Sequence, residues 1–321
     1  MTNSRIAYAI ALAALIAAPF FIYPIFLMNV MCFALFASAF NLLIGYTGLL
    51  SFGHAALFGS AAYITGHVLS KMGLPVEVAV LMGTATGAAM GLVMGLLAIR
   101  RTGIYFTMIT LALAQMVYFI CLQAPFTGGE DGLQGVPRGK LLGVINLSSD
   151  LNMYYVVLAI AVSSFALIMR TVHSPFGRVM KAIKENEPRA ISLGYDVNKY
   201  KLVAFVLSAA LSGLAGSTKT LVFGFATLTD VHWNLSGLVV LMTLVGGLGT
   251  LLGPIVGALI IVALENKLGD FGNWLAAATS IEWFKSMGES VTMLTGLIFI
   301  ICVLAFRRGI VGEISVFLKR F

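Results

Sequence analysis

The chain has 321 residues, of which 60% are hydrophobic and 10% are charged, and its mean hydropathy is +0.99. Ordinary soluble domains are about 45 to 50% apolar and about 25% charged, so this composition excludes a water-soluble fold. The formal net charge is +7, but the basic residues are spread over short polar segments. A nucleic-acid partner would need a dense basic face, whereas scattered basic residues suit the loops of a polytopic protein in a lipid bilayer.

Long runs without Asp, Glu, Lys or Arg locate the predicted membrane-spanning helices. The first run extends from Ile6 to Ser70. Because one crossing takes about 20 residues, this run can hold three helices. We expect breaks near Met28-Asn29 and over Tyr46 to Ser51. The N-terminal part has the outline of a signal peptide, but the apolar run continues far past an h-region, so we expect it to be retained as a helix.

Later apolar runs complete an all-α architecture. They are Val78 to Ile99, Thr102 to Gly129, Leu151 to Met169, Leu202 to Thr218, Val231 to Leu264 and Val291 to Phe306. The run from Val231 is too long for one span and short for two, and its middle is rich in glycine. We expect two short segments there, about 235 to 250 and 253 to 268, which either cross twice or are re-entrant. This interpretation gives a single transmembrane domain over 1–321 with about ten transmembrane helices.

The distribution of Lys and Arg predicts the orientation, since cytoplasmic loops are enriched in both. With the N-terminus inside, most of the 20 Lys and Arg residues fall in cytoplasmic segments, above all in 170–201. The segment 123–150 is then external, and Lys219 falls on the outer side. Both termini are predicted to be cytoplasmic.

Small residues recur every fourth position in three of the predicted spans, which allows close helix packing in lipid. The sets are Gly83, Gly87, Gly91 and Gly95; Ser208, Ser212 and Gly216; and Gly249, Gly253 and Gly257. Such a face is used either for static packing or for movement against a partner.

The segment 170–201 contains signals for a short helix from Glu187 to Leu193. Asn186 suits the N-cap, and Gly194 suits the turn that ends a helix. Its apolar side chains are Ala190, Ile191 and Leu193. An apolar surface on a charged loop indicates docking into a groove of another protein, or contact of the helix with the lipid surface.

The chain lacks the residue patterns of an enzyme or an ATPase. The three cysteines, Cys32, Cys121 and Cys302, lie in apolar runs, and the four histidines are scattered, so neither a disulfide framework nor a metal site is predicted. The one Gly-Lys pair, Gly139-Lys140, is followed by leucine and not by the Ser or Thr of a phosphate-binding loop. We therefore expect no catalytic residues, no cofactor and no metal.

A secondary transporter is a weaker alternative. Proton- or sodium-coupled carriers usually place an ionisable group within a span. Glu265 is the one acidic candidate, and it lies beside Asn266 and Lys267 at the end of an apolar run, where an interfacial position is the simpler explanation.

Several stretches in fixed order resemble the branched-chain amino acid ABC transporter permease family, in particular the larger of its two companion permeases. They are Asn41 to Tyr63, Arg101 to Tyr118, Thr127 to Leu133, Ser174 to Gly216 and Gly246 to Leu259. The resemblance covers about residues 35 to 305.

The resemblance implies a multi-pass subunit of the bacterial inner membrane. Its implied partners are a companion permease, two cytoplasmic ATP-binding subunits and a periplasmic protein that delivers leucine, isoleucine or valine. Relatives in the wider family transport urea, short amides or other amino acids, so these substrates remain alternatives.

The same resemblance implies a role for the short cytoplasmic helix. In ABC importers a coupling loop has the pattern Glu-Ala-Ala, three residues, then Gly. Ala190 and Gly194 match the second Ala and the Gly, while Pro188 and Arg189 replace the Glu and the first Ala. The residues assigned to coupling are Glu187, Arg189, Ala190, Ile191, Leu193 and Gly194.

Polar residues within apolar runs are the candidates for a transport pathway, because polar groups in hydrocarbon need partners or a water-filled cavity. They are Asn41, Ser51, His54, Tyr105, Thr107 and Gln115. For His54 a helix-end histidine satisfied by the backbone is an equal alternative. We expect a passage without a strong intramembrane ion pair, since selection can reside in the delivery protein.

Overall fold

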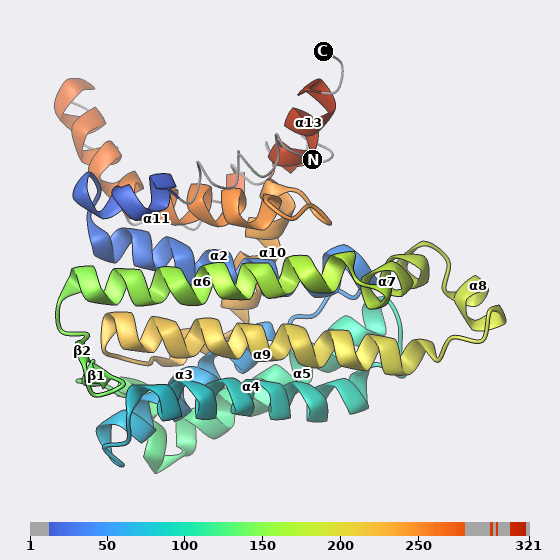
Figure 1. Ribbon diagram of the computed structural model, residues 1–321, viewed down its shortest axis with the longest axis horizontal. Coiled ribbons are helices and arrows are strands. Elements are labelled where there is room, and N and C mark those ends of the chain that lie inside the picture. The colour runs from blue at the N-terminus through green and yellow to red at the C-terminus, as the bar shows by residue number, and fades with distance from the viewer. Residues whose placement is uncertain (1–12, 280–295, 298–299, 301–308, 319–321) are drawn as a thin grey trace.

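The computed structural model describes residues 13–279, 296–297, 300 and 309–318 (Figure 1). This part of the chain is a bundle of helices. Its small sheet is a hairpin in which β1 (Lys140–Leu141) pairs antiparallel with β2 (Ile145–Asn146). The all-α class expected from the composition is confirmed for these residues.

The helices follow the apolar runs of the sequence. They are α2 (Pro24–Thr47), α3 (His54–Ser70), α4 (Val76–Ala98), α5 (Ile104–Gln123), α6 (Asp150–His173), α7 (Pro175–Glu185), α8 (Glu187–Ser192), α9 (Val197–Phe223), α10 (Trp233–Gly246), α11 (Gly253–Thr279) and α13 (Gly309–Leu318), with short 3-10 turns between several of them. Within the described ranges, five helices are long and apolar enough to cross a membrane, namely α2, α4, α5, α6 and α9. The predicted crossing over 291–306 lies almost wholly outside the described residues, and the total of ten stays a prediction.

One predicted helix break is wrong and another is confirmed. Met28 and Asn29 lie inside α2, which begins at Pro24. Proline suits the first turn of a helix because its missing N–H has no intrahelical partner there, and Pro24 sets the boundary for this reason. At the other end, Gly48 takes a left-handed conformation with φ of 77° and ends α2 within the predicted break.

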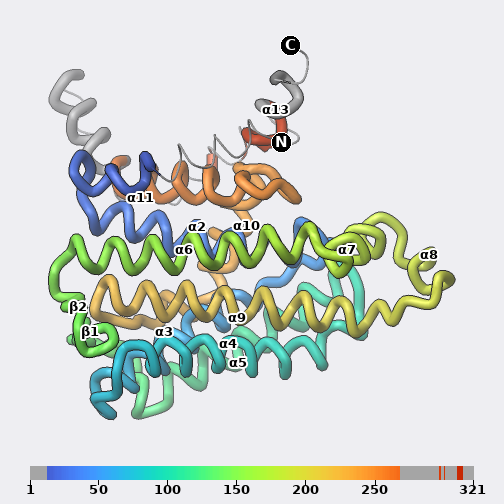
Figure 2. The backbone as a smooth tube through the Cα atoms, in the orientation of Figure 1, coloured from blue at the N-terminus to red at the C-terminus, as the bar shows by residue number. Residues whose placement is uncertain are grey.

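The long helix α9 is the centre of the bundle and packs against α2, α3 and α4. Figure 2 shows α9 between α6 and α4. A Cβ atom on Gly87 of α4 would lie 2.9 Å from both the Ala209 carbonyl oxygen and the Gly213 Cα of α9. The predicted glycine stripe is therefore a packing face, and it lets the two backbones approach directly.

The connection from α9 to α10 folds back into the bundle. Ala226 pairs with Leu133 of the 123–150 segment, and the 3-10 turn η4 (Leu228–Asp230) then reaches α3, where a Cβ on Gly59 would lie 2.8 Å from the Asp230 carbonyl oxygen. From there α10 runs for only 14 residues, about 21 Å at 1.5 Å per residue. It is thus too short for a full crossing, and the predicted 235–250 and 253–268 segments correspond to α10 and to the first part of the longer α11.

The two polar segments singled out by the sequence lie at opposite ends of the bundle. The β1–β2 hairpin of 123–150 is at one end, and α7 and α8 of 170–201 are at the other (Figure 1). At the hairpin end, Arg138 pairs with Asp150 at 2.6 Å and donates to the Val222 carbonyl oxygen at 2.8 Å. The ion pair and the second hydrogen bond tie this segment to the beginning of α6 and the end of α9.

Candidate functional site

The α7–α8 segment projects from the end of the bundle (Figure 1), and its helix boundaries are set by its local sequence. Asn186 caps α8, since its Oδ1 accepts a hydrogen bond of 3.0 Å from the Arg189 N–H. Gly194 has φ of +85°, a conformation that disfavours other residues, and its N–H donates to the Ile191 carbonyl oxygen at 2.9 Å. The predicted cap and stop are confirmed, with α8 ending at Ser192.

One face of α8 is anchored to the rest of the chain. Ala190 is 2% exposed and packs with Ile183 of α7 and Val197 of α9. The Glu187 carboxylate accepts a 2.6 Å hydrogen bond from the ammonium of Lys201, whose side chain is 3% exposed. The expectation that Ala190 belongs to an exposed apolar surface is therefore wrong, because this small side chain fills the contact between three helices.

The two other apolar side chains of the predicted helix are exposed. Ile191 is 58% exposed and Leu193 is 70% exposed, and the helix α8 lies beyond the end of the bundle (Figure 1). Two large apolar side chains that are exposed two residues apart on a polar segment are suited to contact with a partner. We name Ile191 and Leu193 the loop apex.

The beginning of α9 is fixed by a polar cap. Asp196 accepts a hydrogen bond from the Lys199 backbone N–H at 3.3 Å and pairs with the Lys199 ammonium at 2.9 Å. The side-chain hydrogen bond from Lys199 lowers the pKa of Asp196, and the backbone hydrogen bond lowers it further. The cap therefore stays ionised at neutral pH, which suits the positive end of a helix dipole.

The predicted pathway residues near the end of α2 are bonded within this chain. Asn41 is 3% exposed, and its side-chain amide donates to the Thr250 carbonyl oxygen at 2.9 Å. Ser51 is buried and accepts a 3.1 Å hydrogen bond from the Gly53 N–H. Both side chains thus stabilise the folded backbone.

His54 is fully buried at the start of α3. Its Nε2 lies 2.9 Å from the Ser208 hydroxyl of α9, and that hydroxyl donates to the Ala39 carbonyl oxygen at 2.5 Å. Phe40 and Phe205 contact the imidazole edge-on. His54 therefore joins α2, α3 and α9 through a side chain, and not through the backbone contact considered from sequence.

The polar residues of α5 have two different roles. Thr107 donates to the Leu50 carbonyl oxygen at 2.9 Å, and Thr110 accepts from the Phe52 N–H at 3.2 Å, so both fix the connection between α2 and α3. Tyr105 is 71% exposed and Gln115 is partly buried. The structure does not bring these six predicted residues together around one cavity in the described part of the chain.

A buried ion pair is the main polar feature that the sequence did not predict. Lys219 of α9 pairs with Asp230, and the two side chains are 13% and 4% exposed. Asp230 also accepts hydrogen bonds from the Thr227 N–H at 3.3 Å and from the Thr227 hydroxyl at 3.2 Å. The Lys219 ammonium lies 5.9 Å from the centre of the Phe58 ring, a cation–π contact.

This pair corrects one expectation. Lys219 is not in a loop but near the end of α9, which extends to Phe223. The expected passage without a strong intramembrane ion pair stays a prediction. The connection between α9 and α10 folds back onto the bundle. This fold places Asp230 beside Lys219 of α9. The Thr227-to-Asp230 spacing is a capping box, and this was the signal available in the sequence.

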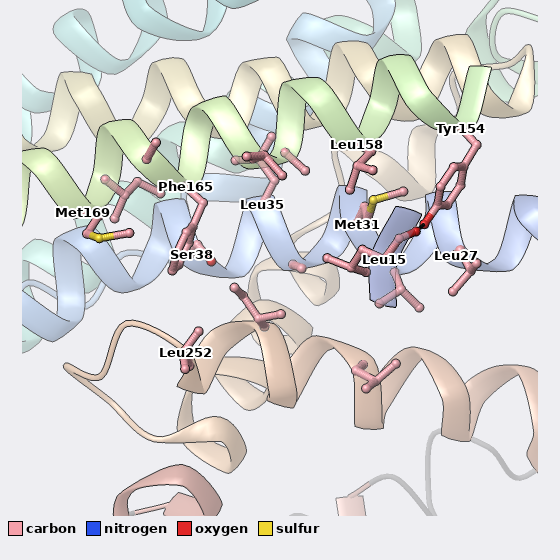
Figure 3. A pocket seen from close by; sticks show the side chains of 18 residues that line it. Leu15, Leu27, Met31, Leu35, Ser38, Tyr154, Leu158, Phe165, Met169 and Leu252 are labelled. Carbon is pink, nitrogen blue, oxygen red and sulfur yellow. Dashed lines mark hydrogen bonds between the residues drawn. The ribbon is translucent and has the colours of Figure 1, made fainter. Parts of the chain in front are cut away.

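The pocket in Figure 3 lies among α2, α6 and α11 and has a volume of 420 Å³. Leu27, Met31 and Phe165 are typical of its apolar walls. Tyr154 directs its hydroxyl to the Leu15 carbonyl oxygen at 2.6 Å. The pocket wall thus offers an apolar surface and no charged side chain to a zwitterionic solute. Among the described residues, no three His, Cys, Asp or Glu side chains are grouped so as to hold a metal ion.

Residues 22–306 match the family model of the branched-chain amino acid transport system permease component, so the chain belongs to this family of membrane transport subunits. A relative is the high-affinity branched-chain amino acid transport system permease protein LivM of Escherichia coli, 26% identical over 267 residues. That match covers 76% of this chain and 63% of the relative, so the chain spans less than two thirds of that protein's length.

Relatives that are named for other substrates match over a similar range. The ribose import permease protein RbsC of Haemophilus influenzae is 27% identical over 65% of this chain and 67% of its own. The solved structure of PsaBC from Streptococcus pneumoniae in complex with Fab covers 91% of this chain and 95% of its own at 15% identity, but its TM-score of 0.42 supports no argument about the fold.

The Lys219–Asp230 pair leads to a stability prediction. Lys219→Met leaves the Asp230 carboxylate buried without its countercharge, which should destabilise the protein by about 3 to 5 kcal/mol. Thermal unfolding of the purified protein in detergent measures the loss. Adding Asp230→Asn to Lys219→Met removes both charges and keeps an acceptor for Thr227, so part of the loss should be recovered.

Lys199→Met is the matched control, because it removes the same ammonium from the exposed pair with Asp196. Exposed pairs contribute little, so its unfolding temperature should stay close to that of the unchanged protein. Equal losses in Lys219→Met and Lys199→Met would show that the buried pair has no special role.

Proposed function

We propose that this chain is a transmembrane permease subunit of a bacterial ABC importer for branched-chain amino acids. Membership of the permease family supports transport, and the loop apex is the single structural observation that supports coupling to a cytoplasmic partner. The proposed partners are a companion permease, two ATP-binding subunits and a periplasmic binding protein. The chain itself supplies part of the passage and no catalytic site.

The proposed orientation places both termini and the α7–α8 segment in the cytoplasm, with 123–150 in the periplasm. The positions of these segments at opposite ends of the bundle support it. Leu142 and Leu193 are 74% and 70% exposed at the two ends. In a cysteine-free background, Leu142→Cys should react with a membrane-impermeant maleimide in cells with a permeabilised outer membrane, and Leu193→Cys only after the inner membrane is opened. The reverse pattern would overturn the orientation.

The proposed passage forms between this chain and the companion permease. Asn41, Ser51 and His54 are buried and bonded internally, which argues against a passage through them. Tyr105 and Gln115 on α5 remain the candidates for contact with solute.

Docking of the loop apex is tested with an introduced charge. If Ile191 and Leu193 enter an apolar groove of an ATP-binding subunit, Ile191→Asp or Leu193→Asp would bury an unpaired carboxylate at a cost of a few kcal/mol. Co-purification of the ATP-binding subunits should then fall about tenfold or more. Gly194→Val should act in the same direction, because valine is strained at φ of +85°.

Val144→Asp is the matched control, since Val144 is an 83% exposed apolar residue at the other end of the bundle. It adds the same charge and should leave co-purification unchanged. Ala190→Asp does not test docking, because Ala190 is buried against Ile183 and Val197 and the change would disrupt the loop itself. Normal recovery of the ATP-binding subunits with both apex variants would overturn the coupling assignment.

Uptake by the reconstituted four-subunit membrane complex with its binding protein tests the substrate. We expect ATP-dependent uptake of radiolabelled leucine that excess isoleucine or valine suppresses and that urea, short amides or ribose leave unchanged. Ribose is included because ribose permeases are among the relatives. The lone chain in vesicles should not accumulate leucine under a proton or sodium gradient. Such accumulation would favour a secondary transporter.

A further inference from the structure

The end of α2 is bonded to the α7–α8 segment. The Lys184 ammonium donates to the Gly45 carbonyl oxygen at 2.8 Å, in the last turn of α2. The last carbonyls of a helix lack intrahelical partners and form the negative end of its dipole, so a lysine is well suited to this position. One turn earlier on α7, the Lys181 ammonium lies 5.4 Å from the centre of the Tyr46 ring.

The turn of α2 just before this one is bonded to the turn between α10 and α11. The Gly249 N–H donates to Asn41 Oδ1 at 3.0 Å, and Asn41 Nδ2 donates to the Thr250 carbonyl oxygen at 2.9 Å. A Cβ on Gly45 would lie 2.9 Å from the Gly249 nitrogen, so glycine is needed for this approach. Gly249 itself has φ of +73°.

The segment that bears Lys184 is stiff enough to act as one piece with the loop apex. Ile183, Ala190 and Val197 join α7, α8 and the start of α9 in one buried contact. The Glu187–Lys201 pair closes the same contact with an ion pair of 2.6 Å. A displacement of α8 should therefore also move α7, the helix that carries Lys184.

We propose that Lys184 is a positioning residue that transmits movement of the α7–α8 segment, through the end of α2, to the turn between α10 and α11. Asn41 is the second part of this link. The inference rests on the proposed docking of the loop apex and assigns the route by which that docking acts on the short helix α10. The turn follows directly on α10, which has 14 residues, so α10 is the helix on which the proposed link acts.

The test separates ATP hydrolysis from transport in the complex with ATP-binding subunits. Lys184→Met keeps most of the side-chain length and removes the donor. Co-purification of the ATP-binding subunits and ATP hydrolysis should stay near those of the unchanged complex, while leucine uptake per ATP hydrolysed falls about two- to fivefold, as expected for loss of an exposed lysine at the C-terminal end of a helix. Lys184→Arg retains a cationic donor and should restore most of the ratio.

Lys199→Met is the control, because it removes a lysine of the same loop that contacts Asp196 and not α2. It should leave uptake per ATP unchanged. Asn41→Leu combined with Lys184→Met should be no worse than the more affected single variant, because both act on one link. An unchanged ratio in Lys184→Met, with docking intact, overturns the link and leaves the proposed function standing. Loss of co-purification in Lys184→Met would assign Lys184 to docking and also overturn it.

A distance measurement makes the result independent of the solute. Spin labels at Leu248, in the turn after α10, and at Leu142, at the opposite end, sit on exposed positions. In the complex with ATP-binding subunits and an unchanged Lys184, addition of ATP and vanadate should change the distance between the labels. The change should disappear in Lys184→Met and return in Lys184→Arg. No change with Lys184 present, or the same change without it, would overturn the proposal.

Discussion

The lack of water inside a bilayer is the constraint on which this structure depends, because polar groups within the bundle are costly to bury unless they find partners in protein. The central helix α9 shows how this is met. Lys219 finds Asp230 on the connection that follows α9, and Ser208 links His54 to the backbone of α2. These contacts and close packing hold α2, α3 and α9 together, because the hydrophobic effect gives helices in lipid no reason to associate.

The same constraint explains why polar residues in apolar runs are poor guides to a transport pathway. Asn41 and Thr107 each use a side chain to bind a backbone group at a helix end or in a turn. A polar residue therefore serves equally well as an internal tie or as a contact for solute, and its sequence position does not distinguish the two. Exposed polar groups on α5, such as Tyr105, are the more informative ones.

Outside the bundle, the side chains that need an explanation are the exposed apolar ones, because water disfavours their exposure. Ile191 and Leu193 lie on a short helix whose other face is fixed by Ala190 and by the Glu187–Lys201 pair. We propose that a partner bound at the loop apex moves this segment. Lys184 contacts the end of α2, and Asn41 of α2 contacts the turn after the short helix α10.

The sequence by itself determined the local features: the apolar runs, the cap at Asn186, the stop at Gly194 and the glycine face of α4. Each depends on residues a few positions apart, so the signal is complete within one segment. Tertiary structure alone decided that Ala190 is buried and that Lys219 meets Asp230. Burial and ion pairing depend on which distant segment folds back onto a helix, and that choice is made by packing of the whole bundle.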